Sequence, residues 1–281
     1  MVRFKDLVYR RSHLTFHQSR EPQLRRWIVQ LASEGKYRTF EEYYHALSSD
    51  AREFEQLLVL ITTRETYFYR MPNQFEVLRN VVLPEIVERE GMLSLQSLSR
   101  KEPYRMRLHV WSAGCATGQE TYSLSMQILE TLRYPKAWDI TVLGTDINPD
   151  ALETARAGQY DAIRLGSVPP QVIERYSKTV SPRTIVLSDE VKAITKFQVI
   201  NLRNLSEQQL FKSAFDIIFC RNVMIYFDLP AQQQLVTALS ACLKPGGHLF
   251  TGEGEVLHLY QHELEVMDKS GCIWYRKPMA K

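Results

Sequence analysis

The feature that most constrains this chain is a regular alternation of short apolar runs and helical stretches after Pro103. The apolar runs end in small or polar residues and cover 108–112, 140–144, 197–201, 215–220 and 248–251. Helical patterns lie between most of them, at 119–133, 149–157 and 231–242. Strands that alternate with helices pair in parallel and are covered on both faces. The pattern predicts an α/β fold with a doubly wound sheet, to which 272–276 adds an antiparallel edge strand.

The segment before this alternation is helical. Residues 22–62 hold three stretches with apolar residues at helical spacing, two of them opened by the capping pairs Thr39 with Glu42 and Asp50 with Glu53. Three short amphipathic helices bury one shared face, which predicts a small bundle. We therefore expect a helical domain over 1–72, a connecting helix over 73–90 and the α/β domain over 91–281.

The charge is distributed unevenly. The whole chain sums to +3, but residues 1–40 hold nine basic and three acidic residues, a net +6, which leaves −3 for the other 241 residues. The overall balance makes a nucleic-acid binder a poor first hypothesis. No apolar run approaches the roughly 18 residues of a membrane span, and the four cysteines are far apart. We expect a cytoplasmic protein without membrane insertion, disulfides or a metal site.

Two loops of the predicted sheet suggest a nucleoside ligand, because ligands of open α/β sheets bind beyond the carboxyl ends of the strands. Gly114 and Gly118 follow the first strand and let the backbone approach a ligand closely. Their spacing is neither the dinucleotide fingerprint nor a Walker motif. Asp146 ends the second strand, where a carboxylate accepts hydrogen bonds from ribose hydroxyls. Its alternative role is to cap the next helix, which Asn148 serves better.

Three strings carry a resemblance to a known family. The strings TTRETYFYR at 62–70, VWSAGCATGQETYSL at 110–124 and FDIIFCRNVMIYF at 215–227 resemble the chemotaxis-receptor methyltransferase (CheR) family in order and spacing. The resemblance extends from about residue 55 to 257. It implies a class I S-adenosylmethionine-dependent methyltransferase with a Rossmann-like sheet, a small inserted β-subdomain around 178–196 and a helical N-terminal domain.

The resemblance also implies an activity and a set of site residues. The chain would act as a protein-glutamate O-methyltransferase on the cytoplasmic helical domain of bacterial chemoreceptors, as a monomer, and would release S-adenosylhomocysteine. Glu120 would hold the methionine part of the cofactor and Asp146 its ribose. The other implied cofactor contacts are Arg64, Thr66, Arg70, Gly114, Asn201, Leu202, Arg221 and Asn222. Arg70, Tyr226 and His109 would act on the acceptor.

The chemistry of the residues agrees with a carboxylate acceptor. A glutamate with a pKa near ~4.3 is already an ionised nucleophile at neutral pH, so the transfer needs alignment and no general base. Methyltransferases acting on nitrogen usually show Asn/Asp-Pro-Pro-Tyr after the fourth strand, and this chain has Cys-Arg-Asn-Val from Cys220. The sequence therefore favours oxygen as the acceptor.

Four departures from the family pattern leave alternatives open. Arg64 replaces a usual Asn, His109 replaces a common Arg, and Glu-Gly-Glu-Val at 253–256 replaces His-Ser-Glu-Asn. Some members of the family have a glycine-bearing loop in the small β-subdomain that docks a receptor's C-terminal peptide. No glycine occurs here between Ser167 and Pro245, so we expect activity that is independent of such a tethering peptide. The main alternative is a cofactor-binding, catalytically weak scaffold of the same fold. A nucleic-acid methyltransferase that uses the basic end ranks below it.

Overall fold

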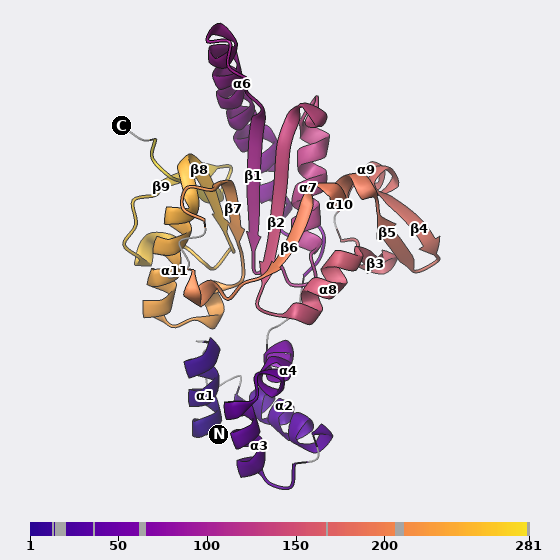
Figure 1. The fold of residues 1–281 in the computed structure, drawn as a ribbon, viewed down its shortest axis with the longest axis vertical. Helices are drawn as coiled ribbons and strands as arrows, with labels where there is room; N and C mark the ends of the chain where they lie inside the picture. Colours follow the sequence, from indigo (N-terminus) through magenta and orange to yellow (C-terminus); the bar gives the residue numbers. More distant parts are fainter. Residues whose placement is uncertain are drawn as a thin grey trace.

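The computed structural model describes residues 1–12, 14, 21–35, 37–61, 66–166, 168–205 and 211–279. Its α/β part is built around a seven-stranded sheet of order β6-β2-β1-β7-β8-β10-β9 (Figure 1). The strands are β1 Met106–Ala113, β2 Trp138–Asp146, β6 Thr195–Val199, β7 Phe215–Cys220, β8 Leu243–Thr251, β9 Glu265–Lys269 and β10 Cys272–Arg276. The first five of these pair in parallel, and β10 pairs antiparallel with both β8 and β9. The doubly wound sheet predicted from the sequence is confirmed.

Both faces of the sheet are covered by helices. Alternate side chains of each strand point to opposite faces and therefore join different cores. Leu108 and Val110 of β1 join a core with α6 (Leu83–Ser99) and α7 (Gln119–Thr131), whereas Trp111 joins a second core with α11 (Leu229–Cys242). The helix α8 (Pro149–Ala157) follows β2. The six residues of β7 are all buried, as expected for a strand inside the sheet.

The last strand differs from the expectation of an edge. β10 runs antiparallel as predicted, but β9 lies outside it and forms the edge of the sheet. Ser270 and Gly271 both have positive φ, 54° and 76°, which is the backbone that tight two-residue hairpins require. The Ser-Gly pair is the sequence signal for this hairpin, which was not predicted.

A second, three-stranded sheet has the order β3-β5-β4. Its strands are β3 Gln159–Asp161, β4 Ser177–Ser181 and β5 Thr184–Leu187, accompanied by α9 Pro170–Tyr176 and α10 Asp189–Ala193. This sheet begins and ends earlier than the expected range around 178–196. The later part of that range forms α10 and the start of β6. Val191 of α10 is buried in the core of the main sheet, so this part belongs to the larger domain.

The helical part contains α1 Val2–Ser12, α2 Glu21–Glu34, α3 Phe40–Ser49 and α4 Ala51–Ile61. The last three match the three predicted helices, and the Thr39 side chain caps α3 by accepting from the Glu42 amide at 3.1 Å. The first, α1, was not predicted as a helix, although Phe4, Leu7 and Val8 have helical spacing and are buried in the bundle core.

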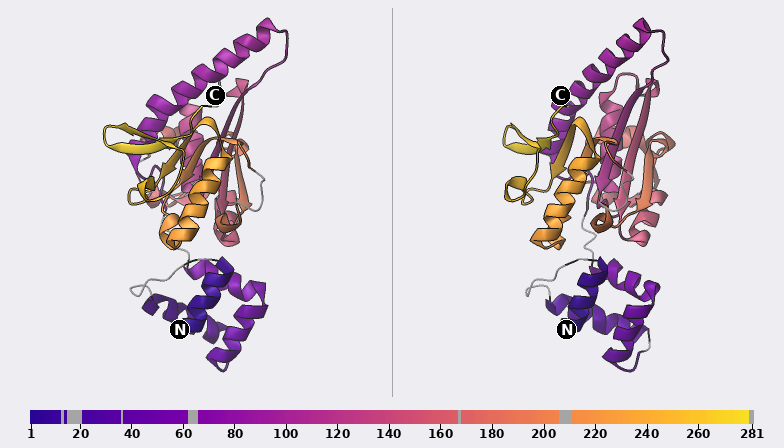
Figure 2. Two further views of the ribbon diagram at one scale, coloured as in Figure 1. Left: turned by 90° about the vertical axis from the view of Figure 1, so that its left-hand side faces the viewer. Right: turned by 60° about the vertical axis from the view of Figure 1, so that its left-hand side comes forward.

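A long helical segment leads from the helical bundle to the sheet. It starts as α5 (Pro72–Val77), passes through a π-helical turn at Leu78–Val82 and continues as α6 to Ser99, beyond the expected end near residue 90. Gly91 does not stop it, since a glycine inside a helix costs only about 1 kcal/mol and Met and Leu residues follow. The far end of α6 projects beyond the sheet (Figure 2).

The helical bundle lies at the end of the sheet where the parallel strands terminate (Figures 1 and 2). Ile147, just after β2, and Tyr226, after β7, pack against the bundle core. Tyr9 of α1 donates a hydrogen bond to Asp228 Oδ2 at 2.6 Å. The bundle therefore covers the edge at which an α/β sheet binds its ligands.

Candidate cofactor and active site

The loop after β1 has the backbone that its glycines predict. Gly114 and Gly118 have φ of 81° and 91°, in the region that favours glycine. The amides of Gly114 and Cys115 donate to the Thr145 carbonyl at 2.8 and 2.9 Å, which fixes the loop to the end of β2. A Cβ added to Gly114 would lie 2.4 Å from Cγ2 of Val223. Glycine thus lets the loops after β1 and β7 touch.

Asp146 ends β2 and faces this loop. Its Oδ2 accepts from the Ala116 amide at 2.8 Å, and its Oδ1 accepts from the Asn148 amide at 2.9 Å. The side chain of Asn148 caps α8 by accepting from the Ala151 amide. Asn148 therefore performs the capping role, as the sequence analysis expected, and the Asp146 carboxylate is held in place beside the glycine loop.

A pocket opens between the helical bundle and the loops that follow β1, β2, β6 and β7. It combines polar groups at one side with apolar side chains at the other, and both domains contribute to it. It is lined by Ser12, Leu14, Gly114, Ala116, Asp146, Ile147, Ile200, Asn201, Leu202, Asn222, Val223, Tyr226 and Phe227. The structure thus brings six of the predicted site residues together: Gly114, Asp146, Asn201, Leu202, Asn222 and Tyr226.

Glu120 and Arg221 form a buried ion pair next to this pocket and do not line it. Arg221 Nε donates to Glu120 Oε2 at 2.7 Å, with the two side chains 1% and 11% exposed. Arg221 Nη1 also donates to the Arg70 carbonyl at 2.6 Å and to Gln74 Oε1 at 3.1 Å. Ser112 Oγ donates to the other Glu120 oxygen at 2.7 Å. This network ties α7, the end of β7 and the segment before α5 together.

The remaining predicted residues are placed differently. Thr66 and Arg70 lie half-buried in the segment that leads from the bundle, and the Arg70 guanidinium lies 5.8 Å from the centre of the Tyr67 ring. Arg64 lies outside the described residues. None of the three is among the described residues that line the pocket.

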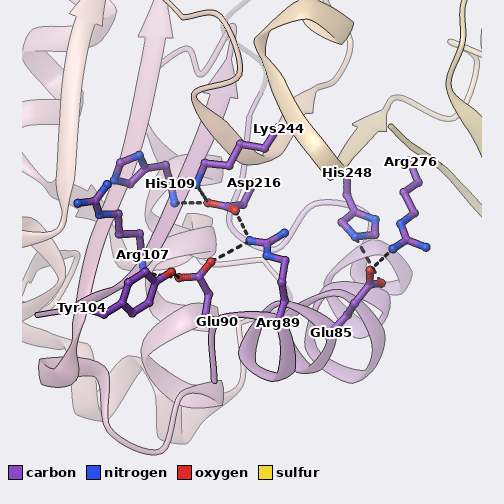
Figure 3. A network of polar contacts seen from close by, with 10 residues as sticks. All are labelled: Glu85, Arg89, Glu90, Tyr104, Arg107, His109, Asp216, Lys244, His248 and Arg276. Carbon is purple, nitrogen blue, oxygen red and sulfur yellow. Dashed lines mark hydrogen bonds and ion pairs between the residues drawn. The ribbon is translucent and has the colours of Figure 1, made fainter. Parts of the chain in front are cut away.

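His109 is not at the site. It lies on β1 five residues before Gly114, which is about 16 Å along a strand. Its backbone amide donates to Asp216 Oδ2 at 2.9 Å, within a network that anchors α6 and includes Arg89 and Lys244 (Figure 3). The expectation that His109 acts on the acceptor is therefore corrected. His109 precedes the glycine motif in the sequence, but it lies in the first half of β1 and not at the strand's carboxyl end, where ligands bind.

Two residues at the site were missed by the sequence analysis as functional groups. Gln74 is 3% exposed and joins Arg221 to the Thr251 carbonyl, to which its Nε2 donates at 2.8 Å. Glu255 is 6% exposed and accepts from backbone amides of the loop after β7. The sequence feature that could have indicated Glu255 is the position of a carboxylate shortly after a buried strand.

The cysteines near the site are not nucleophiles. Cys115 and Cys220 are both buried. Burial raises the pKa of each thiol well above its ordinary value, and nearby carboxylates raise it further. A protonated, buried thiol behaves as a small apolar side chain, in agreement with the sequence-based interpretation.

Comparison with known proteins identifies the family. Residues 64–272 match the description "CheR methyltransferase, SAM binding domain", and residues 1–62 match "CheR methyltransferase, all-alpha domain". This chain belongs to the CheR methyltransferase family. It is an S-adenosylmethionine-dependent methyltransferase, and the family resemblance of the three sequence strings is confirmed.

Named relatives of this CheR methyltransferase cover most of its length. It is 34% identical to a probable chemotaxis protein methyltransferase of Rhizobium etli, over 84% of each chain. It is also 34% identical to chemotaxis protein methyltransferase 1 of Pseudomonas aeruginosa, over 79% of this chain and 77% of that one. The Escherichia coli chemotaxis protein methyltransferase is 32% identical over 90% of this chain and 82% of its own.

The pocket of this CheR methyltransferase fits the nucleoside part of the cofactor. Asp146 presents a fixed carboxylate of the kind that binds ribose hydroxyls, and Ile147, Ile200 and Leu202 offer apolar surface for a flat base. Asn222 Oδ1 is buried and has no hydrogen-bond partner among the described residues. A buried polar atom of this kind is normally satisfied, so a ligand group is a suitable partner.

Proposed function

We propose that this enzyme transfers the methyl group of S-adenosylmethionine to glutamate side chains of bacterial chemoreceptors. The observation that carries the proposal is the composition of the pocket. Among the described lining residues, the ionisable side chains are those of Asp146 and Tyr226. Asp146 is already engaged with two backbone amides, and the phenol of a tyrosine offers an O–H donor.

Such a site suits an acceptor that needs no deprotonation. The cofactor supplies an activated methyl group on a sulfonium. The protein aligns the acceptor, excludes water and leaves a carboxylate as the nucleophile, for which a separation of about 3–3.5 Å is required. Tyr226 lines the pocket and packs against the helical bundle. We propose that its hydroxyl orients the incoming carboxylate. We propose that Arg70, half-buried in the segment that leads from the bundle, adds positive charge near the acceptor.

The helical bundle is the proposed docking surface for the receptor. Arg25 and Arg26 are exposed on α2 and line a shallow concavity with Met1 and Val29. These cations complement an acidic helical partner by electrostatic attraction. We propose a cytoplasmic monomer that meets the cytoplasmic helical domain of the receptor. Among the described residues, no helix combines the length and apolar character of a membrane span.

One of the two reasons for the alternative, a catalytically weak scaffold, no longer applies. It rested on the unusual residues Arg64 and His109, and His109 lies outside the pocket, on the part of β1 that meets Asp216. A histidine at that position therefore gives no reason to expect reduced catalysis.

The test is methyl transfer to purified receptor cytoplasmic fragments, with the label in the methyl group. We expect incorporation that mild base removes as methanol, because methyl esters hydrolyse and methylamides and methyl ethers do not. A fragment whose methylatable glutamates are replaced by alanine serves as the matched control. Label that resists base, or that persists in the control fragment, refutes glutamate O-methylation.

A second measurement tests independence from a tethering peptide. The proposal rests on the hairpin of β4 and β5, whose connection at Pro182 and Arg183 contains no glycine. We expect no binding heat with peptides copied from receptor C-termini and equal transfer rates to receptor fragments with and without that terminus. Saturable peptide binding refutes this part of the proposal.

A further inference from the structure

Glu255 is a buried carboxylate that the proposed reaction does not use directly. It follows β8 in a tight turn in which its own amide donates to the Gly252 carbonyl at 2.9 Å. Its Oε2 accepts from the amides of Asn222 at 2.6 Å and Gly252 at 2.9 Å, and its Oε1 accepts from the Ile225 amide at 3.3 Å. The Met224 amide also contributes. One side chain thus gathers backbone donors from two loops.

The approach of Glu255 depends on a glycine. A Cβ added to Gly252 would lie 2.6 Å from Glu255 Oε2 and 3.1 Å from the Asn222 amide nitrogen. The first distance is too short for a carbon atom, and the second is tighter than most contacts of a Cβ atom. Glycine at this position therefore permits the carboxylate to reach the loop after β7.

Two contacts from outside that loop hold it. Asn222 has φ of 58°, in the left-handed region, which asparagine adopts more often than most residues other than glycine. On one side Val223 touches Gly114, and on the other the Glu255 carboxylate holds the Asn222 amide. The loop is thus fixed between the glycine loop and Glu255.

The same loop presents the site residues. Four residues within the six positions 222–227 line the pocket: Asn222, Val223, Tyr226 and Phe227. In an alignment-driven transfer, a displacement of about 1 Å costs on the order of 100-fold in rate. A group that fixes this loop therefore controls the rate without touching the acceptor.

We propose that Glu255 is a positioning residue that holds the 222–226 loop in the geometry required for methyl transfer. Its carboxylate is satisfied by backbone donors, and Glu255 forms no ion pair with any of the residues that the structure describes. Burial raises the pKa of Glu255, and the surrounding amides oppose that shift. The carboxylate form is the one that accepts from several N–H groups at once. The inference rests on the proposed function where it concerns the transfer rate.

The test compares Glu255→Gln with Glu253→Gln. Glu253 is exposed in the same turn, so its variant makes the same charge change without the buried contacts. In Glu255→Gln an NH2 group replaces one of the two accepting oxygens. This NH2 group faces a backbone N–H group, so two donors meet and one hydrogen bond is lost. We expect kcat to fall at least about tenfold, with the Kd for S-adenosylhomocysteine within threefold of wild type. Glu253→Gln should stay within twofold in both.

Hydrogen exchange supplies a readout that needs no acceptor. We expect the amides of 222–225 to exchange at least about tenfold faster in Glu255→Gln, while those of β1 and β2 keep their wild-type rates. If Glu255→Gln does not fold, Glu255→Asp replaces it, because the shorter side chain keeps the charge but cannot reach both Asn222 and Gly252.

The outcomes separate the two claims. A kcat within twofold of wild type, unchanged exchange at 222–225, or an equal loss of cofactor affinity and kcat overturns the positioning role. Wild-type enzyme that methylates no receptor fragment refutes the proposed function instead. In that case the exchange rates alone decide whether Glu255 holds the loop.

Discussion

Replacement of Arg221 by methionine should destabilise the enzyme strongly in the absence of any ligand. The side chain is 1% exposed and pairs with Glu120 at 2.7 Å. Methionine fills much of the same volume between Phe75 and Phe219 but leaves the Glu120 carboxylate, 11% exposed, without its cation. Removal of one partner from a buried pair costs about 3–5 kcal/mol, because the other charge stays desolvated.

The loss is larger than that of a single hydrogen bond for a structural reason. Arg221 Nη1 also serves the Arg70 carbonyl and Gln74 Oε1, so the variant removes donors from two further groups. For a domain of this size, each 1 kcal/mol lowers Tm by roughly 2–4 °C. We therefore expect a fall of roughly 6–20 °C in thermal unfolding, together with a lower urea midpoint at unchanged slope.

A double-mutant cycle isolates the ion pair from the packing. Glu120→Gln removes the stranded charge, so the double variant should be less destabilised than the sum of the single variants, with a coupling of about 1–3 kcal/mol. Arg175→Met is the control, because its pair with Glu130 is exposed (59% and 30%) and should contribute at most about 1 kcal/mol. Additive single losses, or an Arg221→Met loss no larger than the control, would refute the reasoning.

Three further predictions concern single residues. Asp146→Ala should weaken S-adenosylhomocysteine binding at least tenfold, about 1.4 kcal/mol, in calorimetry, through loss of charge-assisted hydrogen bonds; unchanged affinity would remove Asp146 from the site. Burial lowers the pKa of His248 to about 4, below the value of about 6.5 in an unfolded chain. The unfolded state therefore takes up the proton first, and stability, complete above about pH 6.5, should fall by up to about 3 kcal/mol as the pH approaches 4. Urea unfolding of wild type and His248→Phe checks this, and equal pH slopes would contradict it. His109→Gln should leave kcat within twofold, since His109 lies about 16 Å along β1 from the glycine loop; a tenfold loss would return it to the site.

The sequence determined the main features of the fold because they depend on local patterns. Alternating apolar runs and helical stretches specified the parallel sheet, and the spacing of Leu24, Ile28 and Leu31 specified a buried helix face. Where local signals compete, the prediction was less accurate. The connecting helix was expected to end near residue 90, yet α6 continues to Ser99. The strand β9 was missed because its charged residues conceal its pairing with β10.

The site was determined in part by sequence and in part by tertiary structure. The positions of Gly114 and Asp146 followed from the sequence, because Gly114 directly follows β1, Asp146 is the last residue of β2, and the ends of parallel strands meet at one edge. Only the folded chain shows that Arg221 pairs with Glu120, that the helical bundle closes the pocket with Ser12 and Leu14, and that Glu255 reaches the loop after β7. The hydrogen bonds of Arg221 with Glu120 and of Glu255 with Asn222 join residues 101 and 33 positions apart, and that of Tyr9 with Asp228 joins residues 219 positions apart. Their geometry depends on how whole helices and strands pack, and no local pattern of residues encodes it.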